Sequence, residues 1–184
     1  AETGGFRGDA YKGYDLLLAA LVRQYIPPCQ KKQPYLVNLW GIPPILDVFW
    51  ERDLTILRNL LEELGCQVNT FWGEGEGLTQ LQRAGQACLN LVLSDIYGAN
   101  TIAAFQEIPS LRFAFPIGEK ATSQFLYEVG NALNIPQEQV ASLVSSKQKI
   151  YYHYFDRLIE VYTDSDFQRY SVIVGDANYA PAVS

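Results

Sequence analysis

Apolar runs of strand length alternate with segments of helical period along most of this chain, and this alternation limits the possible folds more than any other feature. Strand-like runs occupy residues 35–40, 66–72, 89–93 and 111–115. Between the first two runs, leucines recur every three or four residues from Leu54 to Leu64, as on one face of a helix. Strands that alternate with helices pair in parallel and are covered by helices on both faces. The sequence therefore predicts a three-layer α/β/α domain with a mainly parallel sheet of the flavodoxin or Rossmann type.

The other helical patterns set the predicted domain boundaries. Further helices are expected over residues 14–26, 99–107, 125–133 and 136–162, and a last strand over 170–174 precedes the start of a helix at 177–183. On this interpretation, residues 1–34 are an incoming linker and helix, and residues 35–135 are the central α/β domain. Residues 136–169 form a long connecting helix, and residues 170–184 begin a next α/β unit that stays incomplete. The chain is then a piece of a longer protein.

Charge and hydropathy argue against two classes of partner. The chain has 14 lysines and arginines against 20 aspartates and glutamates, a net charge of −6. This leaves no broad basic face for nucleic acid. Apolar runs such as residues 16–22 are far shorter than the roughly 20 residues that cross a bilayer, and no export signal opens the sequence. We expect a cytoplasmic protein without nucleic-acid or membrane partners.

Sequence motifs for a metal or a nucleotide are missing. Cys29, Cys66 and Cys88 lie far apart in the sequence and His153 is the sole histidine, whereas a metal centre needs about four clustered ligands. The glycine-rich residues 73–77 contain two glutamates and are followed by leucine, so the dinucleotide spacing fails. The sequence predicts an acidic loop there, no metal ligands, and no cofactor bound by this chain itself.

Ligands of an open parallel sheet bind at the carboxyl ends of the strands, near the switch in strand order. Five residues there are candidates for a cavity wall: Gly41, Ser94, Asp95, Tyr97 and Gly118. Ser94 and Asp95 form a ligand-facing pair, or Asp95 instead caps the helix that begins near Gly98. No histidine lies near Ser94 in the sequence to activate it as a nucleophile, so no catalytic residue is assigned.

Aromatic residues make up 13% of the chain. The three tryptophans are expected in the core. Residues 151–155 put four aromatic rings and His153 on a single helix, more than one helix face can bury. Exposed aromatic surface of this kind marks interfaces, so this helix is predicted to dock against further domains.

An ordered set of short motifs runs through nearly the whole chain. It includes Gly5-Phe6-Arg7-Gly8, Gly13-Tyr14-Asp15, Val37-Asn38-Leu39-Trp40-Gly41, the helical pattern from Leu54 to Gly65, Asn90-Leu91-Val92-Leu93-Ser94, Phe115-Pro116-Ile117-Gly118, Thr122 to Phe125 and Gly175-Asp176. In order and spacing, this set resembles the middle portion of nitrogenase component 1 type oxidoreductase subunits. The resemblance implies the central one of three related α/β domains.

The resemblance also implies a redox function for the parent protein. In this family, electrons pass from an ATP-dependent iron–sulfur reductase, through a metal cluster held between paired subunits, to a buried substrate. The expected partners are the missing domains of the same chain, a homologous partner subunit and the reductase. The cluster-ligating cysteines lie mainly in the first domain, so the parent is expected to be an oxidoreductase with an iron–sulfur cluster, while the present residues are inactive by themselves.

One position departs from the family pattern. In the nitrogenase α subunit, the strand that resembles residues 89–93 ends in the cysteine that ligates the iron–molybdenum cofactor, and the matching residue here is Ser94. A neutral serine is a weaker iron ligand than a thiolate, so ligation is not carried over. The chain then resembles the β-type or cofactor-assembly branch. Two alternatives remain open: a non-catalytic scaffold for metal-cofactor assembly, and a flavodoxin-like module that binds a small ligand.

Overall fold

The computed structural model describes residues 8–27, 31–44, 46–70, 77–162, 172–175 and 178–183. The chain divides into two compact units, Ala1–Phe115 and Pro116–Ser184. Within the described residues, no helix has both the length and the apolar character needed to cross a membrane.

The first unit is built on a parallel sheet. Its described elements are α1 (Ala10–Tyr25), β1 (Leu36–Trp40), α2 (Trp50–Glu63), β2 (Gln67–Thr70), α3 (Leu78–Ala84), β3 (Leu89–Val92), α4 (Ala99–Ala104) and β4 (Ser110–Arg112). The strand order is β2-β1-β3-β4, and each neighbouring pair is parallel. This is the flavodoxin-type order, so the predicted fold class is confirmed.

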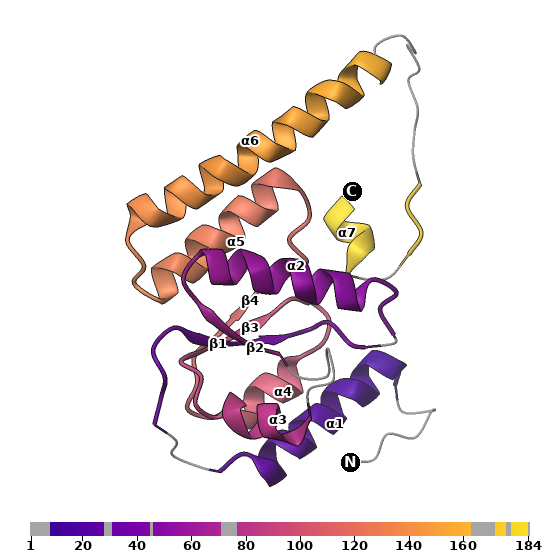
Figure 1. Cartoon of the computed structure of the whole chain (residues 1–184). Helices are drawn as coiled ribbons and strands as arrows, with labels where there is room; N and C mark the ends of the chain where they lie inside the picture. The colour runs from indigo at the N-terminus through magenta and orange to yellow at the C-terminus, as the bar shows by residue number, and fades with distance from the viewer. Residues whose placement is uncertain are drawn as a thin grey trace. The chain divides into compact units, whose positions relative to one another are not determined.

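Helices cover both faces of this sheet. α2 lies on one face, and α1, α3 and α4 lie on the other (Figure 1). The chain runs from β1 outward to β2 and then back past β1 to β3. Right-handed crossovers in opposite directions place α2 and α3 on opposite faces. β1 and β3 are buried along their whole lengths, as expected for strands with helices on both sides.

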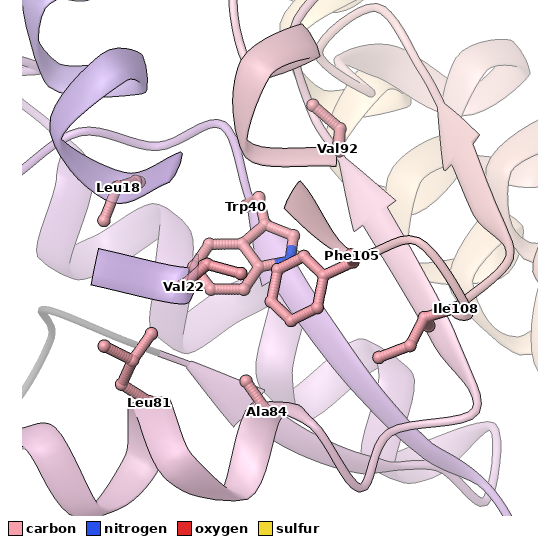
Figure 2. Packing of buried hydrophobic residues seen from close by; sticks show 8 residues of the cluster. All are labelled: Leu18, Val22, Trp40, Leu81, Ala84, Val92, Phe105 and Ile108. Carbon is pink, nitrogen blue, oxygen red and sulfur yellow. The ribbon is translucent and has the colours of Figure 1, made fainter. Parts of the chain in front are cut away.

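A hydrophobic cluster fills the space between the sheet and the helices α1, α3 and α4 (Figure 2). Its centre is Trp40 of β1, whose ring lies 5.4 Å from that of Phe105. The surrounding members come from α1, α3, β3 and the segment after α4: Leu18, Val22, Leu81, Ala84, Val92 and Ile108. α1 therefore packs into the same hydrophobic core as the sheet, although it precedes all four strands in the sequence.

A row of polar side chains, in which the three asparagines are buried, crosses the same face of the sheet. Asn69, Asn38, Asn90 and Ser110 are register partners on the four neighbouring strands. The Asn69 amide donates to Asn38 Oδ1 at 2.9 Å, the Asn38 amide donates to Asn90 Oδ1 at 2.8 Å, and the Asn90 amide donates to Ser110 Oγ at 3.3 Å. Because buried amides are costly without partners, this row fixes the register of the strands.

The second unit contains a helical hairpin of α5 (Gly118–Ala132) and α6 (Gln137–Tyr162), and the short α7 (Tyr179–Val183). The hairpin buries Phe125, Leu126 and Val129 of α5 and Val140 of α6. A Cβ at Gly130 would lie 2.6 Å from Val140 Cγ2. Glycine is therefore required at this point for the two helices to pack closely.

Two predicted element boundaries are wrong. The fourth strand covers Ser110–Arg112 rather than residues 111–115, although the Phe113 N–H still donates to the carbonyl oxygen of Val92 at 2.9 Å. The helix expected over 99–107 ends at Ala104. There Phe105 leaves helical geometry, and its ring packs on Trp40.

A short helix was missed and a strand was wrongly predicted. α3 has seven residues with apolar side chains at a spacing of three, and it follows the glycine-rich segment that suggested only a loop. Of the last predicted strand, residues 172–174 are described and do not form a strand. Residues 170–171, the acidic loop 73–76 and the end of the second predicted strand at 71–72 lie outside the described residues.

Candidate functional site

The carboxyl ends of β1 and β3 form the switch point of the sheet, because the chain leaves β1 towards β2 on one side and returns to β3 on the other. Ligand sites of open α/β sheets lie at such points. We call this edge, with the loops that follow β1 and β3, the crest.

Gly41 directly follows β1 and is held closely against β3. Its φ is +98°, and a Cβ on it would lie 2.7 Å from the backbone nitrogen of Leu93. Its carbonyl oxygen accepts a hydrogen bond from the hydroxyl of Tyr97, whose ring stacks on Tyr11 of α1 at 5.1 Å. Glycine is required at this position by both its backbone conformation and the space around it.

Ser94 follows β3 and is completely buried. Its hydroxyl oxygen accepts hydrogen bonds from the backbone N–H groups of Ile96 at 3.1 Å and Tyr97 at 3.2 Å. Its carbonyl oxygen accepts from the guanidinium of Arg112, with the shorter contact at 3.0 Å. Both oxygens of Ser94 therefore hold the loop in place, which is a structural role.

The predicted cap of α4 is wrong. Asp95 is exposed, and the N-cap residue Gly98 makes no side-chain hydrogen bond. The first turn of α4 is instead capped by buried Asp15 of α1. Its carboxylate accepts from the backbone N–H groups of Asn100 at 3.0 Å and Thr101 at 2.9 Å, and from the Thr101 hydroxyl at 2.6 Å.

Three of the five predicted wall residues are brought together within the first unit. Gly41, Ser94 and Tyr97 form one hydrogen-bonded group with Arg112, which sequence reasoning missed. Asp95 adjoins this group in sequence. Gly118 is the first residue of α5 in the second unit, with φ at +81° and open space where a Cβ would lie.

The crest loops also expose apolar side chains. Val48 and Phe49, after β1, are 87% and 61% exposed, and Ile96, after β3, is 56% exposed. A hollow of about 360 Å³ lies beside the first loop, lined by Val48 to Arg52 and Thr55. A second hollow, of about 340 Å³, lies at the opposite edge of the sheet, between the end of α1 and the segment 104–108. The sequence contained a sign of this exposed loop, because apolar residues are already frequent in Leu46–Phe49, before α2 begins.

The described residues do not fit an iron–sulfur cluster or another metal. They contain no group of three or more histidine, cysteine or acidic side chains that could hold an ion. Cys66 and Cys88 precede β2 and β3, at the edge opposite the crest. Burial chiefly, with a smaller effect of Cys88, raises the pKa of the Cys66 thiol to about 12. A thiol that stays protonated is a poor ligand. Cys29 lies outside the described residues.

These observations define a parallel α/β domain. Hydrogen bonds to and from the backbone hold the loops of its crest in place. The described residues offer no group of side chains that could ligate a metal cluster. A family model described as Nitrogenase component 1 type Oxidoreductase matches residues 1–180. The chain belongs to this family, which confirms the resemblance seen in the sequence.

Curated relatives carry two kinds of name. The chain is 32% identical over 126 residues to the nitrogenase molybdenum-iron protein alpha chain of Methanothermococcus thermolithotrophicus. It is 31% identical over 132 residues to one of the subunits of the light-independent protochlorophyllide reductase of Chlorobium luteolum. These matches cover 66% and 70% of this chain and 25% of each relative. The chain thus spans about a quarter of the length of the relatives it matches.

Among solved structures, nitrogenase Cp1 at pH 6.5 is similar to this chain with a TM-score of 0.63 at 20% sequence identity. The match covers 82% of this chain and 29% of that chain. At this level of identity the similarity shows the fold alone, and it agrees with the parallel α/β architecture described above.

Proposed function

We propose that these residues form the middle α/β domain of a nitrogenase-type oxidoreductase subunit, in which the crest is one wall of a cavity and supplies no cluster ligand. The observation that carries this proposal is the state of Ser94. It stands where the resemblance places a ligating cysteine, yet its side chain is buried and its hydroxyl accepts two backbone N–H groups.

The exposed side chains of the crest support the role of a wall. Val48, Phe49 and Ile96 project from the loops after β1 and β3 at the edge where ligands of such sheets bind. Apolar side chains exposed together are typical of surfaces that pack against another part of a protein. We propose that further domains of the same subunit and a homologous partner subunit cover them.

The electron route is the finer part of the proposal. Electrons enter from an ATP-dependent iron–sulfur reductase and reach the substrate through a cluster held by residues outside this domain. The relatives named nitrogenase and protochlorophyllide reductase support a reductive function. The proposed arrangement keeps the predicted boundaries, with a central domain over 35–135 and a connecting helix over 136–169.

A scaffold for cofactor assembly is the second candidate, and the serine at position 94 also favours it, because a protein that passes a cofactor on does not need a thiolate there. A small-ligand module of flavodoxin type has less support, since the carbonyl oxygens of Gly41 and Ser94 at the crest already accept hydrogen bonds within the chain.

Electron uptake distinguishes the two candidates. The complete subunit would be purified without oxygen together with its partner subunit and mixed with a reduced ATP-dependent iron–sulfur reductase. Oxidation of the reductase that requires both ATP and the complex supports the oxidoreductase. Transfer of a bound metal cofactor to a recipient apoprotein, without oxidation of the reductase, supports the scaffold and contradicts the main proposal.

A further inference from the structure

α6 is much longer than the helix on which its first part packs. α6 has 26 residues and α5 has 15. Val140 and Val144, near the start of α6, are buried, and the Gln148 amide donates a hydrogen bond to Glu119 in the first turn of α5. Because the two helices are antiparallel, residues 149–162 extend beyond the beginning of α5, by roughly 21 Å at 1.5 Å per residue. Figure 1 shows these residues, which we call the α6 extension.

The apolar surface of the helix widens along the α6 extension. The buried residues between Val140 and Val144 span about 100° of the helix circumference, the width of surface that one neighbouring helix covers. In the extension, apolar side chains span about 200°, and His153, Asp156 and Arg157 occupy the remaining arc. The apolar side chains are 41–63% exposed: Ile150, Tyr151, Tyr152, Tyr154, Phe155, Leu158 and Ile159. The extension therefore has apolar surface for two neighbours.

Residues 172–174 expose a second apolar surface in the same unit. Val172 and Val174 are 89% and 92% exposed, and Ile173 is 43% exposed. An unbroken run of β-branched residues is typical of a parallel strand that helices cover on both faces. A strand needs neighbours for its backbone N–H and C=O groups. Among the described residues of the second unit, no strand is present with which this run could pair.

The order of elements links the two surfaces. α6, the run 172–174 and α7 follow one another in the same alternation as the helices and strands of the first unit. In that unit, α2 precedes β2 and packs against it. The run begins ten residues after the end of α6, a distance that the chain spans with at most about 35 Å. A single α/β unit can therefore cover both surfaces, and its sheet and a helix supply the two neighbours that the α6 extension needs.

We propose that the residues following this chain in the complete subunit form a second α/β unit, in whose sheet residues 172–174 pair as a strand and against which the α6 extension packs. Tyr152 and Ile159, at one edge of the apolar arc, contact the second neighbour. The inference rests on the proposed function in one respect, namely that the complete subunit has further domains. The relatives, of which this chain spans a quarter, are long enough for such a unit.

The composition of the two surfaces favours the subunit's own chain over a separate partner. An interface between separate proteins is only about as apolar as the rest of their surfaces, whereas the interior of a domain is largely apolar. Both the apolar arc of the α6 extension and the run 172–174 are without charged residues. α7 also buries none of its residues, as expected for a helix whose sheet is incomplete.

Hydrogen exchange in the complete subunit, purified with its partner subunit, tests this inference. Backbone N–H groups of a paired strand exchange slowly. Residues 172–174 are therefore expected to exchange at least about a hundredfold more slowly in the complete subunit than in the 184-residue chain. β3 is the protected reference in both samples. Equal exchange of residues 172–174 in the two samples overturns the inference.

Two variants of the complete subunit test the contact with the α6 extension. Ile159→Glu, in the apolar arc, is expected to speed exchange at residues 172–174 at least about tenfold and to leave β3 unchanged. His153→Glu adds the same charge on the other side of the helix and is expected to change neither. Equal effects of the two variants at residues 172–174 overturn the inference. The comparison of the unaltered proteins stands by itself if Ile159→Glu prevents folding.

The partner subunit is the alternative cover. If its removal abolishes the protection of residues 172–174 but not that of β3, the partner covers them and the inference is overturned. Iron content and electron uptake test the proposed function separately. A complete subunit that contains iron and oxidises the reductase, while residues 172–174 exchange fast, contradicts only the present inference. Protected residues 172–174 in a subunit without iron contradict only the redox function.

Discussion

At the scale of single residues, Ser94 explains how the loop after β3 is held at the crest, because both of its oxygens accept hydrogen bonds. The sequence identified its position, because a buried strand ends there. Its role was not visible, because it depends on where the backbone N–H groups of Ile96 and Tyr97 point. Replacement by alanine removes the acceptor that these two donors share, of which the Tyr97 N–H is buried and the Ile96 N–H is partly buried. We expect Ser94→Ala to lower the free energy of unfolding by about 1–3 kcal/mol, measured by urea denaturation.

The control for this prediction is Ser142→Ala on the exposed surface of α6, where we expect a change within about 0.5 kcal/mol. Ser94→Ala should also leave the iron content of the complete complex unchanged. A loss of iron without a loss of stability would show that Ser94 is a ligand and would contradict the structural role.

Gly41 and Gly118 form a natural pair for a second prediction, since both have positive φ but only Gly41 faces backbone atoms within 3 Å of an added Cβ. An alanine at Gly118 meets conformational strain alone, which costs about 1 kcal/mol. At Gly41 the added methyl group also pushes against the backbone of Leu93, so we expect a cost of more than about 2 kcal/mol. Thermal unfolding of the two single variants checks the order, and equal losses would contradict it.

At the scale of elements, the polar row across the sheet makes a third prediction. Asn38 is its centre, since its amide donates to Asn90 Oδ1 and to the carbonyl of Ala84 at 2.9 Å, and its oxygen accepts from Asn69. Replacing Asn38 by leucine removes the hydrogen-bond partner of these buried groups. We therefore expect the free energy of unfolding to fall by about 2–4 kcal/mol. Asn59→Leu, on the exposed side of α2, is the control in chemical denaturation and should cost little.

The hydrogen bonds between Asp15 of α1 and the first turn of α4 predict how the stability of the fold depends on pH. Burial acts to raise the pKa of Asp15, but hydrogen bonds from the side chains and backbone amides of Thr101 and Asn100 outweigh it and hold the pKa below its usual value. A carboxyl whose pKa is lower in the folded chain stabilises the fold above its unfolded pKa of about 3.9. That contribution is lost as the pH falls through the folded pKa.

Asp15→Asn should therefore destabilise the chain near neutral pH and remove part of the loss of stability below about pH 4. Urea denaturation at several pH values measures both effects, with Asp95→Asn as the exposed control. Parallel stability profiles for Asp15→Asn and the original chain would show that this carboxylate does not cap α4.

The elements also show where sequence reasoning reaches its limit. β1, α2 and β3 were predictable because their apolar patterns reflect burial by many neighbours at once. α3 was missed because seven residues give only two turns of pattern. The cap of α4 was assigned to nearby Asp95, whereas the actual carboxylate, Asp15, lies 85 residues away from Asn100. Contacts over such distances in sequence depend on the folded chain, and a local pattern does not contain them.

At the scale of the whole molecule, the proposed role as one wall of a cavity accounts for a crest whose described residues offer no metal-binding cluster. The chain matches a family of oxidoreductases over residues 1–180 and spans about a quarter of its relatives. A domain that forms one wall of a cavity needs a fixed shape rather than reactive groups. Gly41, Ser94 and Tyr97 provide that shape through hydrogen bonds to the backbone.

The central claim is that this chain is a domain that supplies no metal ligand, within a subunit that carries a metal cluster. The most direct measurement is the content of iron and acid-labile sulfide in the complete subunit, purified without oxygen with its partner, and in the 184-residue chain under the same conditions. We predict iron and sulfide in the complete subunit and none in the 184-residue chain. Stoichiometric iron in the 184-residue chain would contradict the ligand-free crest, and iron in neither sample would contradict the redox function.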